Sequence, residues 1–308
     1  MRHRVFTFLC AVFVAATAAQ RADALANRVF VSARSGNNAN SCDNVLTPCQ
    51  TLAGAVLQLN PGGEAIVLDS GGYGPVTITQ SVTIEAPPGV TAFVHPPSGD
   101  AITISAGSGD TVILRGLTLN GGSGNGITAN TVGRLFVEKC VITGYAAGGI
   151  YFGASGGTLF VRDVDVRACA GNGIFVTSAG AASRAVIRDS AFHKNNNGIE
   201  AASGSVVTVT GCVAAENFHG FVVDTAGAAD ADLTLDRVQA IANTRGLAAI
   251  ATGGKTATLR FTGSVVTQNA TGVFISGGTA LGSSPGTSLV AGNGSDVSGT
   301  LGTPITLD

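Results

Sequence analysis

Residues 159–174 read LFVRDVDVRACAGNGI, and this arrangement of apolar and polar positions occurs seven times along the chain. Each copy opens with a triplet whose first and third residues are apolar, and successive triplets begin 22 to 26 residues apart. Repeats of this length, built from short alternating runs, are typical of solenoid proteins. The seven triplets are Val112-Ile113-Leu114, Leu135-Phe136-Val137, Leu159-Phe160-Val161, Ala185-Val186-Ile187, Val207-Thr208-Val209, Leu233-Thr234-Leu235 and Leu259-Arg260-Phe261.

Each copy predicts three short strands separated by turns. The opening triplet alternates as a half-buried strand does, and a second alternating pair follows after a polar or Gly corner. A Gly followed by an apolar residue then begins the third strand. The second-strand pairs are Leu117/Leu119, Cys140/Ile142, Val164/Val166, Ser190/Phe192, Cys212/Ala214, Val238/Ala240 and Ser264/Val266. The third strands begin at Gly126-Ile127, Gly149-Ile150, Gly173-Ile174, Gly198-Ile199, Gly220-Phe221, Gly246-Leu247 and Gly272-Val273.

Stacking of equivalent strands would give three parallel sheets around a triangular core. We therefore expect an all-β fold, a right-handed parallel β-helix of roughly ten coils. A leucine-rich repeat would need an L-x-x-L-x-L-x-x-N order, which is absent. A left-handed hexapeptide helix would need a strict period of six, whereas these coils vary in length.

The first 24 residues have the features of a secretory signal peptide. A basic start, Arg2-His3-Arg4, precedes an apolar run from Val5 to Ala19, and Ala22-Asp23-Ala24 is a small-x-small cleavage site. No other apolar stretch is long enough for a membrane anchor. The sequence thus predicts an exported protein without a transmembrane segment, secreted, periplasmic or at the cell surface. Without residues 1–24 the chain has 14 basic and 18 acidic residues, which disfavours nucleic acid as a partner.

The remaining chain divides into three regions. Residues 25–60 are expected to cap the open end of the solenoid with an edge strand, a loop and a lid helix, because an uncovered end exposes core and strand edges. The helix is predicted from Leu52, Ala55, Val56 and Leu59, which share one helical face. Residues 61–275 form the β-helix, and residues 276–308 an irregular last coil and tail.

Five cysteines remain outside the signal peptide. Cys42 and Cys49 are close in sequence, and export permits oxidation, so we predict a disulfide between them. Cys140 and Cys212 hold the same repeat position three coils apart, about 14 Å at the usual strand spacing, which is beyond disulfide reach. We expect these two to be buried free thiols, and Cys169 to be free as well.

Asparagines recur at one turn of four consecutive coils. They are Asn195, Asn217, Asn243 and Asn269, each three residues after the end of the second-strand pair. Stacked amides of this kind can hydrogen-bond along the axis and satisfy turn backbone groups. We interpret them as a structural ladder rather than as a ligand site.

Several features together resemble exported bacterial β-helix proteins of the pectin-lyase-like superfamily. They are the coil pattern, the start Val29-Phe30-Val31-Ser32, the Cys42 to Pro48-Cys49 loop, Thr51-Leu52 opening a helix, and Gly71-Gly72-Tyr73 before Val76-Thr77-Ile78. The resemblance covers nearly all of the chain after the signal peptide and implies the β-helix fold. The superfamily includes lyases, polygalacturonases and epimerases, so it does not specify a reaction.

Catalytic motifs of these enzymes are absent from the sequence. There is no Asn-Thr-Asp, no Asp-Asp pair and no Asp-Pro-His-Asp. Phe218-His219-Gly220 is only faintly similar to the Gly-His-Gly of polygalacturonases, because the first Gly is missing and the second recurs in every coil.

Stacking of the coils places one polar patch on the outside of the solenoid. It comprises Asp165, Arg167, His193, Lys194 and Glu216. Such a patch contains an acid, a base and a cation for an anionic sugar, as a lyase requires, and a Ca²⁺ ion would be its cofactor only in that case. The alternative is an ordinary solvated face with cross-coil ion pairs.

An outward apolar column is the other unusual surface feature. Ile113, Phe136, Phe160 and Val186 would stack on one sheet, where a long turn, a partner, a glycan or a second copy could cover them. Covering by a turn is the interpretation we favour.

Two functional hypotheses follow. The first is a non-catalytic exported β-helix that binds polysaccharide or has a structural role at the surface. The second is a carbohydrate-active enzyme, most plausibly a lyase acting on uronate polymers; no cofactor is required by the first.

Overall fold

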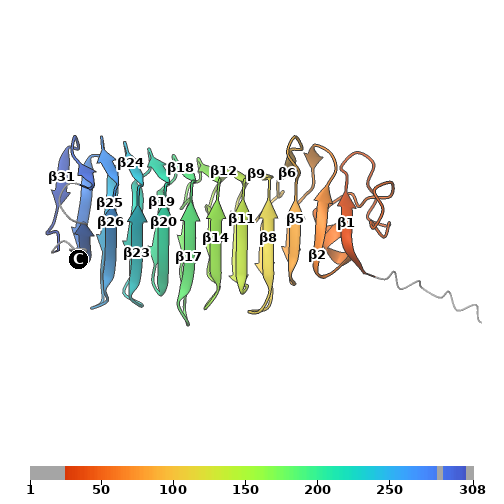
Figure 1. The fold of residues 1–308 in the computed structure, drawn as a ribbon, viewed down its shortest axis with the longest axis horizontal. Coiled ribbons are helices and arrows are strands. Elements are labelled where there is room, and N and C mark those ends of the chain that lie inside the picture. The colour runs from red at the N-terminus through yellow and green to blue at the C-terminus, as the bar shows by residue number, and fades with distance from the viewer. Residues whose placement is uncertain (1–24, 283–286, 303–308) are drawn as a thin grey trace, which may run out of the picture.

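The computed structural model describes residues 25–282 and 287–302 and shows a right-handed parallel β-helix (Figure 1). The predicted fold class is thereby confirmed. Every inter-strand ladder is parallel, and each strand pairs with the equivalent strand one coil away. The predicted signal peptide lies outside the described residues.

Three sheets run the length of the solenoid. The first sheet contains β1 (Ala26–Val31), β2 (Leu59–Val67), β5 (Val82–Glu85), β8 (Thr111–Arg115), β11 (Arg134–Glu138), β14 (Thr158–Arg162), β17 (Ser183–Arg188), β20 (Ser205–Thr210), β23 (Ala231–Asp236), β26 (Ala257–Thr262) and β29 (Thr279–Gly282). The second contains β3 (Gly71–Gly72), β6 (Ala92–Val94), β9 (Leu117–Gly122), β12 (Val141–Tyr145), β15 (Asp165–Arg167), β18 (Ala191–His193), β21 (Val213–Ala215), β24 (Gln239–Ile241), β27 (Val265–Thr267) and β30 (Leu289–Val290). The third contains β4 (Val76–Ile78), β7 (Ile102–Ser105), β10 (Asn125–Thr131), β13 (Gly148–Phe152), β16 (Ile174–Val176), β19 (Asn197–Ala202), β22 (His219–Asp224), β25 (Arg245–Ile250), β28 (Thr271–Ser276) and β31 (Ser295–Ser298).

The core consists of the inward positions of the repeat. In the first sheet Leu159, Ile187 and Leu233 are fully buried, and the same holds for their neighbours along each column. Burial of apolar surface at about 25 cal/mol per Å² stabilises each coil against the next. The segment from residue 276 onwards, expected to be irregular, adds one further strand to each sheet through β29, β30 and β31.

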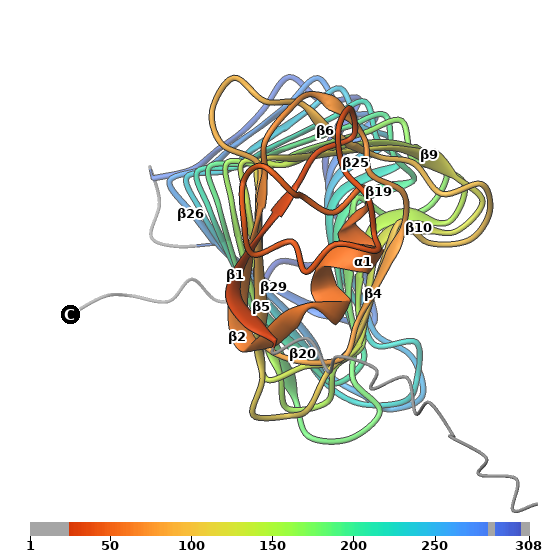
Figure 2. The same cartoon turned by 90° about the vertical axis from the view of Figure 1, so that its right-hand side faces the viewer.

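The N-terminal end of the solenoid is covered by α1 (Leu52–Leu57), as the view along the axis shows (Figure 2). Thr51 is the N-cap, and its side chain accepts a hydrogen bond of 3.0 Å from the Gly54 amide. Leu52, Ala55 and Val56 are buried, whereas Leu59 lies beyond the helix as the first residue of β2. No helix in the described part of the chain is long and apolar enough to cross a membrane.

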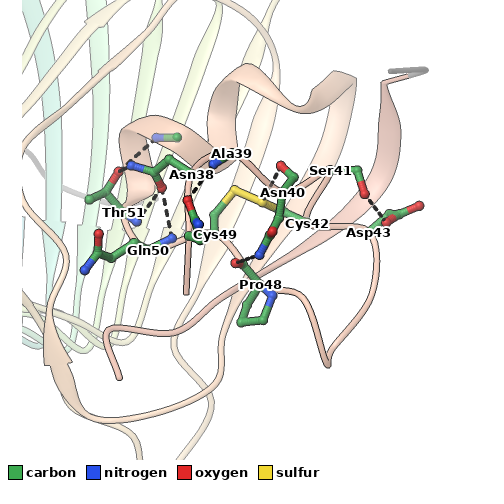
Figure 3. The surroundings of a disulfide bond; sticks show 12 residues. Asn38, Ala39, Asn40, Ser41, Cys42, Asp43, Pro48, Cys49, Gln50 and Thr51 are labelled. Atoms are coloured by element: carbon green, nitrogen blue, oxygen red, sulfur yellow. Dashed lines mark hydrogen bonds between the residues drawn. A yellow bond between two sulfur atoms is a disulfide. The ribbon is translucent and has the colours of Figure 1, made fainter. Parts of the chain in front are cut away.

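Cys42 and Cys49 form the predicted disulfide (Figure 3). The surrounding loop is held by Asn38, whose side-chain oxygen accepts from the amides of Gln50 and Thr51 at 2.9 and 3.1 Å. Cys140, Cys169 and Cys212 are buried free thiols, as predicted, and burial raises the pKa of each.

The asparagines lie in one internal column. The Asn195 amide N–H donates to Asn217 Oδ1 at 2.9 Å, and the pattern repeats from Asn217 to Asn243, from Asn243 to Asn269 and from Asn269 to Asn293. Asn293 is a further member, beyond the four predicted from the sequence. At its other end the column begins at Cys169, whose amide donates to Asn195 Oδ1 at 3.0 Å.

Candidate functional site

The polar patch predicted from the sequence forms two separate ion pairs. Arg167 Nη1 lies 2.8 Å from Asp165 Oδ2, and Lys194 Nζ lies 3.5 Å from Glu216 Oε2. His193 pairs in register with Arg167 on the adjacent strand but has no hydrogen bond linking it to either pair. The Lys194 and Glu216 side chains are 66% and 58% exposed, and exposed pairs of this kind contribute little stability.

Backbone geometry gives Lys194 and Glu216 a further role. Both have left-handed φ values, 56° and 57°, at the residue immediately before a ladder asparagine. Ala168, Ala242 and Gln268 adopt the same conformation at the equivalent corner. The position is therefore fixed by the turn and accepts side chains of different chemistry, which weakens the case that these two residues were selected for catalysis.

A more extensive polar array lies on the outer face of the third sheet. One column of this array is formed by the residue immediately before the repeat glycine, or before its equivalent Ala101. In successive coils this residue is Asp100, Asn125, Gly148, Asn172, Asn197, His219, Arg245 and Thr271. Three residues further on, a second outward column holds Thr103, Thr128, Tyr151, Phe175, Glu200, Val222, Ala248 and Phe274.

Hydrogen bonds connect these columns across four coils. Glu200 Oε2 accepts from Asn172 Nδ2 at 2.9 Å and from Asn197 Nδ2 at 2.8 Å. Asn197 Oδ1 lies 2.8 Å from His219 Nδ1, and His219 Nε2 lies 3.1 Å from Arg245 Nη1. The guanidinium of Arg245 in turn packs over the Phe274 ring, 3.6 Å from its centre.

The donor and acceptor roles in this hydrogen-bonded network can be assigned by starting from Arg245. A guanidinium can only donate, so His219 Nε2 must accept and the imidazole proton must reside on Nδ1. Nδ1 then donates to Asn197 Oδ1, which leaves the Asn197 amide nitrogen to donate to Glu200. The bonds from Arg245 through His219 and Asn197 therefore all point towards Glu200 Oε2, which also accepts from Asn172 on its other side. Within the described residues Glu200 Oε1 has no protein hydrogen-bond partner.

The surroundings shift the pKa values of Glu200 and His219 in opposite directions. Burial raises the pKa of Glu200, and the negative charge of Asp224 adds to this, while the bonds from Asn197 and Asn172 oppose it. Burial lowers the pKa of His219 to about 4, and the positive charge of Arg245 acts in the same direction. At neutral pH His219 is thus an uncharged link between a cation and a carboxyl group.

A small aromatic hollow adjoins the carboxyl group. The rings of Tyr151 and Phe175 stack with centroids 5.7 Å apart, and with Asn125 and Asn172 they line a hollow of about 180 Å³. Phe175 pairs in register with Glu200, so the aromatic surface and the carboxyl group are direct neighbours. We take the hollow and the hydrogen-bonded chain together as the candidate site.

Larger hollows lie elsewhere on the molecule. One of about 440 Å³ lies between α1 and β4, and one of about 320 Å³ lies over the outward column of the first sheet. In that column Phe136 and Phe160 stack at 4.6 Å and remain partly exposed. The hollow on the first sheet also sets stacked rings beside a partly buried carboxylate, Glu138, but both oxygens of that carboxylate are bound by Arg115 and Arg162.

This site was not predicted from the sequence, although it lies beside the repeat glycine. Position-by-position comparison of the residue before that glycine would have shown a column of Asn, His and Arg in place of one recurring residue type. The motif around His219 matches poorly and does not identify it. Its significance lies in its contacts with Asn197 and Arg245, which come from neighbouring coils and share no motif with it.

A metal centre finds no support in the described residues. No group of three or more His, Cys, Asp or Glu side chains is placed there so that it could hold an ion.

The three parallel sheets, the turn ladder and the capped end define a right-handed parallel β-helix protein. The family model described as "Right handed beta helix region" matches residues 65–237, and the chain belongs to this family. No curated protein matches the chain.

Solved structures with the same fold include carbohydrate-active proteins. The complex of XylC with xylose has a TM-score of 0.64 at 9% identity, with 83% of this chain and 69% of that chain covered. Pectate lyase Pel9A has a TM-score of 0.52 at 14% identity, with coverage of 87% and 74%. An alginate lyase from Paenibacillus sp. has a TM-score of 0.63 at 16% identity, with coverage of 87% and 97%. Likeness at these identities shows the fold.

Proposed function

We propose that this protein binds a polysaccharide along the outer face of its third sheet. The observation that carries the proposal is the stacked Tyr151–Phe175 pair, in a hollow that Asn125 and Asn172 also line. A sugar ring offers apolar C–H faces to an aromatic surface and hydroxyl groups at its rim to amides. Sites of this composition, mostly apolar with a few placed polar groups, are typical of small-ligand recognition.

The polar groups beside the rings retain hydrogen-bonding capacity. Asn172 Nδ2 donates to Glu200, but no hydrogen bond among the described residues uses Asn172 Oδ1. Glu200 Oε1 is likewise without a protein partner. Hydroxyl groups of a sugar can donate to both oxygens. Because the coils repeat along the axis, a polymer lying parallel to the axis could place successive units over successive coils.

The test is binding of the full chain to a polysaccharide panel, compared with Tyr151→Ala and Phe175→Ala. Loss of a stacked ring should weaken binding about tenfold, equivalent to about 1.4 kcal/mol. Phe160→Ala is the matched control, since it removes a ring of the stacked pair on the first sheet. Equal loss in all three variants, or no loss in the first two, would refute the assignment.

A second candidate function is carbohydrate cleavage at the same face. The observation that favours it is the divergence of two linked titratable groups, with the pKa of Glu200 raised and that of His219 lowered. Such divergence is common where an acid or base takes part in a reaction. An assay for new reducing ends and for unsaturated uronate ends on the same panel tests it, with Glu200→Gln expected to abolish activity but not folding.

We also propose that the chain is exported and loses residues 1–24. The Cys42–Cys49 disulfide is the kind of bond that persists in oxidising compartments. N-terminal sequencing of the protein from culture fractions tests both points, and a protein that retains residues 1–24 in the cytoplasm would contradict them.

A further inference from the structure

Carboxylates stand on both sides of the aromatic hollow. On one side Asp100, two residues before β7, accepts a hydrogen bond of 2.7 Å from the Asn125 amide through Oδ1. On the other side Glu200 pairs in register with Phe175. Asp224 lies one coil beyond Glu200 on the same outward face, close enough to raise the pKa of Glu200 by its charge.

Compensating cations are not placed beside the hollow. Strands β10, β13, β16, β19 and β22 contain no Lys and no Arg. Arg245 is on β25, three strands from β16 and two strands from Glu200 on β19, which at the usual spacing is about 14 Å and about 10 Å. Both distances exceed the screening length of about 8 Å at physiological ionic strength. The guanidinium is also engaged with His219 and Phe274.

The cations at the neighbouring corner are engaged as well. Arg167 is paired with Asp165, and Lys194 is paired with Glu216. A divalent cation that bridged carboxylates of the protein and carboxylates of an acidic polysaccharide would need a cluster of oxygen ligands. The described residues provide no group of three or more acidic, His or Cys side chains for one.

From this charge arrangement we infer that the polysaccharide bound at the third sheet is uncharged, a polymer of neutral sugar units, and that uronate polymers are disfavoured. The inference rests on the proposed polysaccharide-binding function and specifies its ligand class. Neutral hydroxyl groups can donate to Glu200 Oε1 and Asn172 Oδ1, whereas a uronate carboxylate placed there offers only acceptors and a like charge.

The ligand class has a chemical consequence. Elimination by a lyase depends on a carboxylate or a carboxyl ester that acidifies the neighbouring C–H bond of the sugar. A polymer of neutral sugar units that carries neither group cannot react in this way, so its cleavage at this site would proceed by addition of water. The assignment therefore separates the site from the reactions named for the pectate and alginate lyases that share its fold.

The experiment measures binding of the full chain at 0.15 M NaCl with EDTA present. The neutral probes are xylan, mannan, β-glucan and fully methyl-esterified homogalacturonan; the acidic probes are alginate and de-esterified homogalacturonan. The two homogalacturonans share one backbone and differ in charge. We expect at least about tenfold tighter binding of the best neutral probe than of either acidic probe. Of the two homogalacturonans, the esterified form should bind more tightly.

Asp224→Asn should strengthen binding of the acidic probes several-fold, because it removes a like charge while Oδ1 remains able to accept from the Ala226 amide. Asp236→Asn, on the first sheet, is the control and should change nothing. Acidic probes that bind as tightly as neutral ones, or tighter, would overturn the ligand class but leave polysaccharide binding intact. Absence of binding to every probe would overturn both proposals.

Discussion

Asn217 Nδ2 donates a hydrogen bond of 3.0 Å to Asn243 Oδ1, and the backbone amide of Asn217 donates to the same oxygen, also at 3.0 Å. One side-chain oxygen thus satisfies two buried donors from the coil before it. Asn243 Nδ2 in turn donates to the carbonyl of Ala214 at 3.0 Å. The ladder couples the coils through side chains at a turn, beside backbone bonds such as the one of 3.0 Å from the Thr244 amide to the Asn217 carbonyl.

Asn243→Ala should therefore destabilise the protein strongly. The change removes the partner of the buried Asn217 backbone amide and the bonds from Asn243 Nδ2 to the Ala214 carbonyl and to Asn269 Oδ1, and a buried orphan costs about 1–3 kcal/mol. We expect a loss of about 2–4 kcal/mol in the free energy of unfolding, measured with urea. Asn293→Ala, at the partly exposed end of the ladder, should cost clearly less. Equal losses of unfolding free energy in the two variants would show that burial of Asn243 adds nothing to the effect.

Gly198→Ala tests the close packing of the repeat glycines. A Cβ at Gly198 would lie 2.4 Å from the Gly220 carbonyl oxygen and 3.1 Å from the Ala214 Cβ. Overpacking of this kind costs about 1–3 kcal/mol, and backbone on the next coil cannot move aside without disturbing its own ladder. Thermal unfolding should show the loss. Gly109→Ala, where an added Cβ meets nothing within 4 Å, should leave the transition unchanged.

Loss of the Cys42–Cys49 disulfide should loosen the N-terminal cap first. The bond closes a loop of sequence separation 7, for which the chain-entropy model gives about 2–3 kcal/mol. In the Cys42→Ser/Cys49→Ser variant we expect faster proteolysis around residues 34–50 and a lower unfolding temperature. Reductant should reproduce both effects in the wild type and have none in the variant. A wild type that is insensitive to reductant would contradict this role.

The fold could be predicted from sequence because it depends on a repeated local pattern. Val207, Leu233 and Leu259 each mark an inward strand position, and their spacing alone predicts a parallel stack. The disulfide was predictable because Cys42 and Cys49 are close in sequence. In these cases the residues that interact are either neighbours or copies of one another.

The candidate site could not be predicted in the same way, because its residues differ from coil to coil. Asn172, Glu200, His219 and Arg245 come from four coils and share no motif. Their relation depends on which column each occupies and on side-chain directions that the repeat does not encode. The patch around Arg167 is predicted from charge and stacking position, and charge on a solenoid surface is often satisfied by a neighbouring partner, as it is by Asp165.

His219 should make stability depend on pH below neutrality. Its pKa is lowered to about 4 in the folded protein, against about 6.5 when unfolded, so the unfolded chain binds more protons between these values. The contribution is fully present above pH 6.5 and is lost as the pH falls towards 4. The loss should amount to about 2–3 kcal/mol, measured by urea unfolding at several pH values.

His219→Gln should remove this part of the pH dependence, whatever it does to stability at neutral pH. Glu200 acts in the opposite sense, because its pKa is raised on folding. Its contribution is present at low pH and is lost as the pH rises through the raised pKa. The comparison is therefore cleanest in a Glu200→Gln background, where the loss on acidification should be larger than in the wild type. If His219→Gln and wild type lose stability equally between pH 6.5 and 4, other groups carry the effect, and the neutral imidazole between Asn197 and Arg245 is refuted.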